Sequence, residues 1–291
     1  MSLPTNTIST ADWVAAARDW HLRNTAGLFE DPYAGKLCGW RLKLVRLIRP
    51  WEWVLFKVVL KPIVPSSMCV IMRARYAEES LERLIETGIR QYVILGAGMD
   101  SFAFRRPELV SRIDSFEVDH PVTQRKKLQR IERAGLEVPP NHHFVAADLS
   151  EVSPVDALAG TSFDASEPAF ISLLGVSYYL TPEDLASTLR AIAGGMCRGT
   201  RIVVDYIFDA ESSDPATHDM RRKMLKFVAK RGEPMRSSYS MDAMHQLMAE
   251  AGFRAVENIR MTDLTDAYTK NLPPLAVEPP DMFGFANFEV Q

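Results

Sequence analysis

Cysteine is scarce in this chain, and its few copies stand far apart. Three cysteines occur among 291 residues, at Cys38, Cys69 and Cys197, and none belongs to a C-x-x-C pair. An odd number at this spacing favours neither a disulfide framework nor a zinc site. We therefore expect no bound metal, a reducing compartment and a cytoplasmic location.

The chain also lacks an excess of either charge and a long uncharged apolar run. Its formal net charge is -3, which gives no reason to expect nucleic-acid binding. The opening residues MSLPTNTISTADW lack the basic and then apolar segments of a signal peptide. The most hydrophobic region, residues 40–65, contains more charged residues than a bilayer core accepts. They are Arg41, Lys43, Arg46, Arg49, Glu52, Lys57 and Lys61. The expected partner is a small molecule, and membrane contact is not expected.

What is present is an alternation of short β-rich runs and helical segments. The runs lie at 91–96, 115–119, 143–148, 169–175 and 200–208, which predicts a parallel, doubly wound α/β sheet. Thr181 and Ser240 are typical N-caps of two later helices. The last runs, 253–261 and 282–290, are predicted to form an antiparallel pair at the sheet edge. This order resembles the Rossmann-like class I methyltransferase fold, a mostly parallel seven-stranded sheet with an antiparallel last strand.

The stretch VILGAGMDSFAFR, residues 93–105, carries the first chemical signal. Its Gly96-Ala97-Gly98 turn would let a ligand approach the backbone at the end of the first strand. In the dinucleotide fingerprint a third glycine follows, whereas Ser101 stands here, and Asp100 would repel a pyrophosphate. A nicotinamide oxidoreductase is thus disfavoured.

Acids follow at the next two strand ends. Asp119 lies 21 residues after Gly98, about where an acid reaches a ribose diol in both NAD and adenosyl ligands. Asp148 could accept from an adenine amino group, and Leu149 could cover the ring. Either acid alone could be an ordinary polar strand end. Together they suit a nucleoside without phosphates, such as S-adenosylmethionine.

The ordered set of motifs resembles one known family. VILGAGMDSFAFR, FEVDHP with the downstream Gln124-Arg125-Lys126-Lys127, VAADL and SLLGVSYYLTPED are similar to the bacterial branch of the leucine carboxyl methyltransferase family, whose members use S-adenosylmethionine. AAARDWHLR, FEDPYA and MRARYAEESL resemble its N-terminal helical part. The resemblance covers most of residues 11–260.

The resemblance implies roles for matching positions. Arg73, with Arg75 as the alternative, would hold the cofactor carboxylate, and Tyr179 would help fix that end. Asp119 would bind the ribose, and Asp148 with Leu149 would flank adenine. The remaining residues expected at the cofactor are Gly96, Ala97, Gly98, Asp100, His120, Leu174 and Gly175. Many relatives have Glu where this chain reads Leu174-Gly175, which puts one cofactor contact in doubt.

The chemistry of transfer then bears on the acceptor. Methyl transfer from a sulfonium is an in-line displacement that needs alignment and exclusion of water rather than a covalent nucleophile. A carboxylate is already ionised at pH 7, whereas a phenol or alcohol usually needs a base.

None of the six histidines shows a readable carboxylate partner, and His142 and His143 look like surface residues. We therefore expect methyl ester formation on a small-molecule carboxylate, in specialised metabolism for instance, with S-adenosylhomocysteine as the second product. A phenol or hydroxyl of a polyketide-like substrate, and a non-catalytic adenosyl-binding protein, remain as alternatives.

Two regions are candidates for the acceptor pocket. Residues 38–65 carry Trp40, Trp51, Trp53 and Phe56 among basic residues and could cap an apolar substrate or form an ordinary helical cover. Residues 209–239 have the position of a lid insertion. We accordingly divide the chain into an N-terminal cover with the carboxylate element (1–88), a cofactor-binding core (89–208), a lid (209–239) and a C-terminal part completing the sheet (240–291), in a monomer or homodimer.

Overall fold

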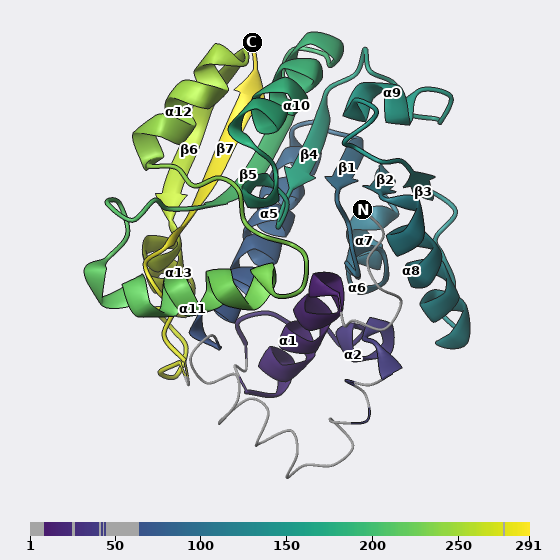
Figure 1. Cartoon of the computed structure of the whole chain (residues 1–291). Coiled ribbons are helices and arrows are strands. Elements are labelled where there is room, and N and C mark those ends of the chain that lie inside the picture. Colours follow the sequence, from purple (N-terminus) through teal and green to yellow (C-terminus); the bar gives the residue numbers. More distant parts are fainter. Residues whose placement is uncertain (1–8, 25–26, 41, 43, 45–63, 276) are drawn as a thin grey trace.

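The computed structural model describes residues 9–24, 27–40, 42, 44, 64–275 and 277–291 (Figure 1). Its strands are β1 Gln91–Leu95, β2 Asp114–Asp119, β3 His142–Ala146, β4 Ala169–Leu173, β5 Arg201–Ile207, β6 Phe253–Arg260 and β7 Phe283–Val290. The α-helices are α1 Thr10–Asn24, α2 Ala34–Leu37, α5 Met68–Glu86, α6 Phe102–Arg105, α7 Pro107–Val110, α8 Pro121–Arg133, α9 Pro154–Leu158, α10 Pro182–Gly195, α11 His218–Ala229, α12 Met241–Glu250 and α13 Met261–Thr269. Short 3₁₀ turns among these residues are η2 Pro65–Ser67, η3 Ser177–Tyr179 and η4 Pro215–Thr217.

The seven strands form one sheet in the order β3-β2-β1-β4-β5-β7-β6. β1 pairs in parallel with both β2 and β4, and parallel pairing continues outward to β3 and β5. β7 runs antiparallel to β5 and β6, between which it lies. The predicted class I methyltransferase layout is confirmed, including the antiparallel pair made by the last two strands.

Alternate side chains of the central strands serve two different cores. Val93 and Leu95 pack with α9, α10 and α12 on one face of the sheet. Tyr92 and Ile94 pack with α5, α6, α7 and α13 on the other. This period-2 alternation, buried on both sides, explains why the parallel strands read as continuous apolar runs.

Local capping fixes the two helices predicted from their first residues. Thr181 accepts from the backbone N–H of Asp184 at 3.1 Å before α10, and Ser240 accepts from Ala243 N–H at 3.0 Å before α12. Each hydroxyl satisfies a donor that has no partner within the helix.

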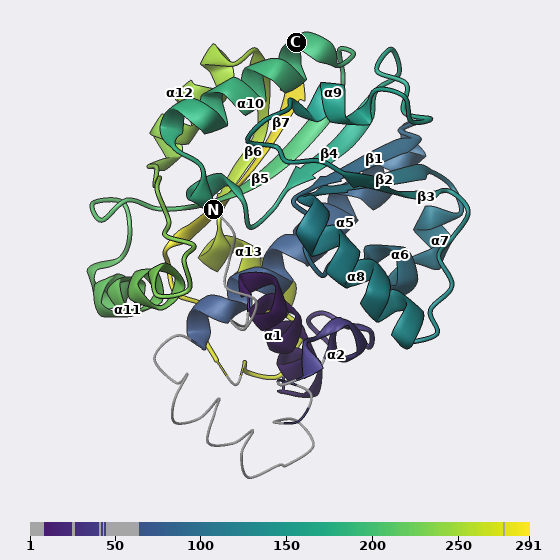
Figure 2. The same ribbon diagram turned by 45° about the vertical axis from the view of Figure 1, so that its right-hand side comes forward.

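Helix α1 lies between α8 and α11 in both views of the molecule (Figures 1 and 2). Arg130 of α8 donates to Asp12 at 2.5 Å, and the rings of Trp13 and Phe227 of α11 meet edge to face at 5.6 Å. This places the N-terminal helix against the ends of the first strands, where ligands bind in open α/β sheets.

Candidate functional site

A cavity of about 380 Å³ lies where α1 faces the carboxyl ends of β1, β2, β3 and β4. Its volume falls within the range of roughly 300–1,000 Å³ that small-molecule sites occupy. The structure brings almost all of the predicted cofactor residues onto its wall: Arg73, Gly96, Ala97, Gly98, Asp100, Asp119, His120, Asp148, Leu149, Leu174, Gly175 and Tyr179.

Arg75 is the exception, because it faces away from this wall. Its guanidinium pairs with Glu79 at 2.8 Å, donates to the carbonyl of Leu28 at 3.0 Å and lies over the ring of Tyr268. Of the two arginines in the R-x-R-Y element, only Arg73 lines the cavity.

The glycine turn is shaped by close packing and by a buried acid. Gly96 has φ +70°, and a Cβ there would lie 2.4 Å from a methyl carbon of Val176. Asp100 accepts from the backbone N–H of Phe102 at 2.7 Å, so its carboxylate caps the short helix after the turn. Burial opposes ionisation of Asp100, but the charges of Arg18 at 2.9 Å and of nearby Arg105 hold its pKa below the ordinary value. This anion occupies the helix start that a pyrophosphate would need, which agrees with the expectation from sequence.

Asp119 closes the second strand with both carboxylate oxygens engaged. Oδ2 accepts from Gly98 N–H at 2.5 Å and Oδ1 from His120 N–H at 2.6 Å. Burial raises the pKa of Asp119 in spite of these bonds. A carboxylate has about four acceptor positions, so two remain for a ligand in the cavity that it lines.

The third strand end brings Asp148 near His120. His120 Nε2 lies 3.5 Å from Asp148 Oδ2. The hydroxyl and backbone N–H of Ser150 donate to Asp148 and lower its pKa. Leu149, adjacent, packs partly on the apolar core, so this rim combines a carboxylate with an apolar surface.

Arg73 is held by two buried partners that the sequence analysis did not identify. Its Nη1 donates to the Tyr178 hydroxyl at 2.9 Å and to Asp205 Oδ2 at 3.0 Å. The other oxygen of Asp205 accepts from Gly175 N–H at 2.6 Å. A Cβ at Gly175, whose φ is +76°, would lie 2.6 Å from Arg73 Nη2. Asp205 therefore connects the arginine of α5 to the turn after β4, and that turn must be glycine for the guanidinium to fit.

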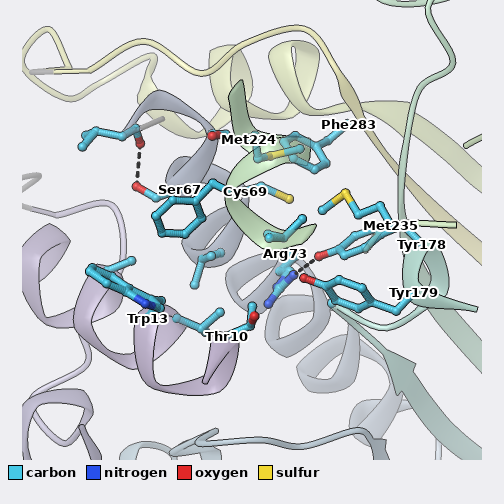
Figure 3. A pocket seen from close by; sticks show the side chains of 18 residues that line it. Thr10, Trp13, Ser67, Cys69, Arg73, Tyr178, Tyr179, Met224, Met235 and Phe283 are labelled. Carbon is cyan, nitrogen blue, oxygen red and sulfur yellow. Dashed lines mark hydrogen bonds between the residues drawn. The ribbon is translucent and has the colours of Figure 1, made fainter. Parts of the chain in front are cut away.

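A second hollow, of about 140 Å³, adjoins the cavity and is called the side chamber below (Figure 3). Both are bordered by Thr10, Val14, Arg73, Gly175 and Tyr179. Residues 209–239, predicted from sequence to be a lid, contribute to its wall through Met224, Phe227, Val228 and Met235. Figure 3 shows Met224, Met235 and Phe283 near Arg73 and Tyr178.

Among the described residues of the other candidate acceptor region, 38–65, Val64 lines the side chamber. Trp40 is 66% exposed and borders neither hollow, while Trp51, Trp53 and Phe56 lie outside the described residues.

Several residues of the site could be found only in three dimensions. Arg18 and Glu233 line the cavity from α1 and the lid, far apart in sequence. Asp205 did carry a signal, because it is a lone acid inside the apolar run IVVDYI. His142 corrects an expectation: it is buried rather than exposed, bonded to Ser115 at 2.8 Å and 3.1 Å from Glu117.

The described part of the chain contains no group of three or more His, Cys, Asp or Glu residues arranged to hold a metal. No helix there is both long and apolar enough to span a bilayer.

Comparison with known proteins identifies the family. Residues 11–193 match the model of the leucine carboxyl methyltransferase family. YktD of Bacillus subtilis (strain 168), whose name proposes an S-adenosyl-L-methionine-dependent methyltransferase, is 36% identical over 201 residues, 69% of this chain and 66% of the relative. A Mycobacterium sp. (strain JLS) protein with the same proposed activity is 28% identical over 228 residues, 75% of this chain and 74% of its own.

Solved structures show the fold independently of sequence. A DUF574 family protein of Streptomyces avermitilis MA-4680 superposes with a TM-score of 0.61 at 16% identity, covering 81% of this chain and 88% of that one. A Thermobifida fusca YX protein with a proposed methyltransferase name gives 0.61 at 19% identity, with 83% and 88% covered. The chain belongs to the leucine carboxyl methyltransferase family of S-adenosylmethionine-dependent enzymes.

Proposed function

We propose that the protein is an O-methyltransferase that forms a methyl ester on a small-molecule carboxylate, with S-adenosylmethionine in the cavity and the acceptor in the side chamber. The two hollows adjoin at the lining residues that they have in common, which we call the shared wall. A methyl group in the first can therefore face an oxygen in the second. Alignment of this kind supplies much of the rate in a displacement between two bound reactants.

The chemistry of the cavity fits the cofactor. Asp119 and Asp148 offer acceptors to ribose hydroxyls and an adenine amino group, and Arg73 offers a cation to the amino-acid carboxylate. Arg73 keeps its charge, because Tyr178 and Asp205 raise its pKa although burial alone would lower it. Asp100 disfavours a pyrophosphate at the helix start, which argues against a dinucleotide.

Transfer then needs little from the protein beyond orientation. When bound, S-adenosylmethionine supplies a sulfonium methyl group: the acceptor oxygen forms a bond to that carbon while the C–S bond breaks and its electron pair stays on sulfur, giving S-adenosylhomocysteine. Arg73 would hold the cofactor carboxylate from the shared wall. Tyr178 accepts from Arg73, so its own proton can be donated to an acceptor carboxylate. Helix α1, which lines the cavity opposite the strand ends, would exclude water from the bound reactants.

The observation that carries the carboxylate proposal is a chamber wall with hydrogen-bond donors and no base. Within the described residues, no Asp, Glu or His lines the side chamber. Burial raises the pKa values of the Tyr178 and Tyr179 hydroxyls and of the Cys69 thiol, so all three stay protonated at neutral pH. A carboxylate needs no deprotonation, whereas a phenol or alcohol would.

One observation favours the rival hydroxyl acceptor. Glu233 lines the cavity, and its charge adds to burial in raising the pKa of Tyr179. It is the described carboxylate best placed to accept a proton from a hydroxyl at the shared wall.

Glu233→Gln separates the two acceptor classes. With a carboxylate acceptor, kcat should stay within a few-fold of the wild type, and the methylated product should release methanol in mild base. With a hydroxyl acceptor and Glu233 as base, kcat should fall by about 10²–10⁴-fold, and an aryl ether product would resist base. Glu211→Gln, an exposed change in the same lid region, is the matched control.

A further inference from the structure

The side chamber differs from the cavity in both size and polarity. Its volume is about 140 Å³, close to the roughly 150 Å³ of an apolar protein cavity that accommodates one benzene molecule. Arg73, at the shared wall, is its one charged residue among those the structure describes. Away from that wall, the lining is made by apolar side chains such as Trp13, Met224, Phe227 and Phe283.

Two contacts anchor the chamber wall on the side of the predicted lid. The backbone N–H of Arg236 donates to the Tyr178 carbonyl at 2.7 Å, which anchors the segment carrying Met235. The ring of Phe227 is held against Trp13 at 5.6 Å and under the guanidinium of Arg231. On this side, a larger ligand group would have to displace packed side chains, which costs free energy.

Polarity limits the ligand as strongly as size does. A second charge on the acceptor would have to leave water for a wall whose described residues offer no counterion away from Arg73, and an unpaired charge in such a place is strongly unfavourable. The hydroxyls of Ser66 and Ser67 also border the chamber. That of Ser67 is already engaged, since it donates to the Val64 carbonyl at 2.6 Å and lies 2.9 Å from His21 Nε2.

We infer that the side chamber selects monocarboxylic acids whose apolar part is a single ring or a branched chain of similar volume. This inference rests on the proposed function and narrows its substrate class. The carboxylate would lie at the shared wall beside Arg73 and Tyr178, and the uncharged group would fill the chamber. Met235 is then a specificity-determining residue, because it lines the chamber beside Tyr178, whose carbonyl anchors its neighbour Arg236.

Equilibrium binding tests the inference separately from catalysis. Calorimetry of the protein loaded with S-adenosylhomocysteine should show benzoate binding at least 10-fold more tightly than acetate or 2-naphthoate, since even one methylene group more or less changes discrimination by about 10–200-fold in apolar pockets. Pentanoate should bind more tightly than pentanedioate, which has the same chain length and a second charge.

Variants of Met235 give the sharper comparison. Met235→Ala should move the preference from benzoate toward 2-naphthoate, and Met235→Trp should weaken benzoate while leaving S-adenosylhomocysteine affinity unchanged. Met220→Ala is the matched control, because Met220 lies on α11 but does not line the chamber. Retained cofactor-product binding shows that each variant is folded.

The outcomes distinguish this inference from the proposed function. The chamber inference is overturned if acids bind without a preference for size or charge, or if Met235→Ala leaves the relative affinities for benzoate and 2-naphthoate unchanged. This holds even if the protein transfers labelled methyl groups to acids. If benzoate binds as expected and Met235→Ala shifts the preference but no acid is methylated, the ester-forming function fails and the chamber assignment stands.

Discussion

Asp119 is the single residue on which ligand affinity should depend most clearly. Asp119→Ala removes the acceptor of the Gly98 and His120 N–H groups and of the proposed ribose hydroxyls. We expect affinity for S-adenosylhomocysteine to fall by about 1–3 kcal/mol, roughly 5- to 150-fold. Calorimetry measures this loss, and Asp119→Asn, which keeps one acceptor oxygen, should lose less. Unchanged affinity in Asp119→Ala would remove this residue from the binding site.

The same residue predicts how ligand binding depends on pH. Burial raises the pKa of Asp119 above its ordinary value of 3.8, and ribose hydroxyls donate to the ionised form. Affinity should therefore be constant above this raised pKa and decline as the pH falls through it, earlier than an exposed aspartate would allow. Titrating affinity in the wild type and in Asp119→Asn checks this, because the decline should be absent from the variant.

Gly175 tests whether Arg73 must occupy its observed place. Gly175→Ala places a Cβ 2.6 Å from Arg73 Nη2 in a backbone with φ +76°. Gly160→Ala imposes similar strain at φ +81° with nothing within 4 Å of the new Cβ. Both should lose about 1 kcal/mol of stability to strain, but only Gly175→Ala should also weaken S-adenosylhomocysteine binding, by 10-fold or more. Equal affinities in the two variants would mean that the guanidinium position is unimportant.

At the scale of elements, the sequence predicts those features that depend on residues close together in the chain. The strands, the caps Thr181 and Ser240, and the glycine turn are set by local pattern, and they appear where expected. Asp205 and Arg18 meet their partners across 132 and 82 residues. No local signal specifies such pairings, so the N-terminal cover was expected but its attachment through Arg18, and the anchoring of Arg73 by Asp205, could not be predicted.

Residues 124–127, part of the motif that resembles the family, attach helix α8 to strand β2 rather than bind a ligand. In α8, Gln124 donates to the Glu117 carbonyl at 3.0 Å, and Lys127 pairs with the Glu117 carboxylate in the interior. These contacts hold α8 on β2 and so fix the position of Asp119 at the end of that strand. His142 completes this buried group, which is why it is not exposed.

Helix α1 is held over the cavity by a buried cation. Arg18 pairs with Asp100 at 2.9 Å and lies 3.5 Å from the fully buried Asp31. Arg18→Met would leave Asp100 and Asp31 without the Arg18 guanidinium, so we expect the free energy of unfolding to fall by about 3 kcal/mol or more. Arg222→Met removes an exposed pair with Asp219 on α11 and should cost less than about 1 kcal/mol. Urea denaturation of both variants makes the comparison, and similar losses would show that the buried pair does not hold the helix.

At the scale of the whole molecule, the buried His21 should make folding sensitive to acid. Its side chain contacts Ser67 at 2.9 Å, and burial lowers its pKa from 6.5 to about 4. As the pH falls below 6.5 the unfolded chain binds a proton that the folded chain does not, so stability decreases until about pH 4 and this contribution then levels off. Between pH 7 and pH 4 the loss from this group is about 3 kcal/mol. Denaturation of the wild type and of His21→Gln across this range isolates the effect, because the carboxylates titrate alike in both proteins. The variant should show a shallower decline by that amount, and parallel curves would mean that His21 gains its proton as readily in the folded chain as in the unfolded one.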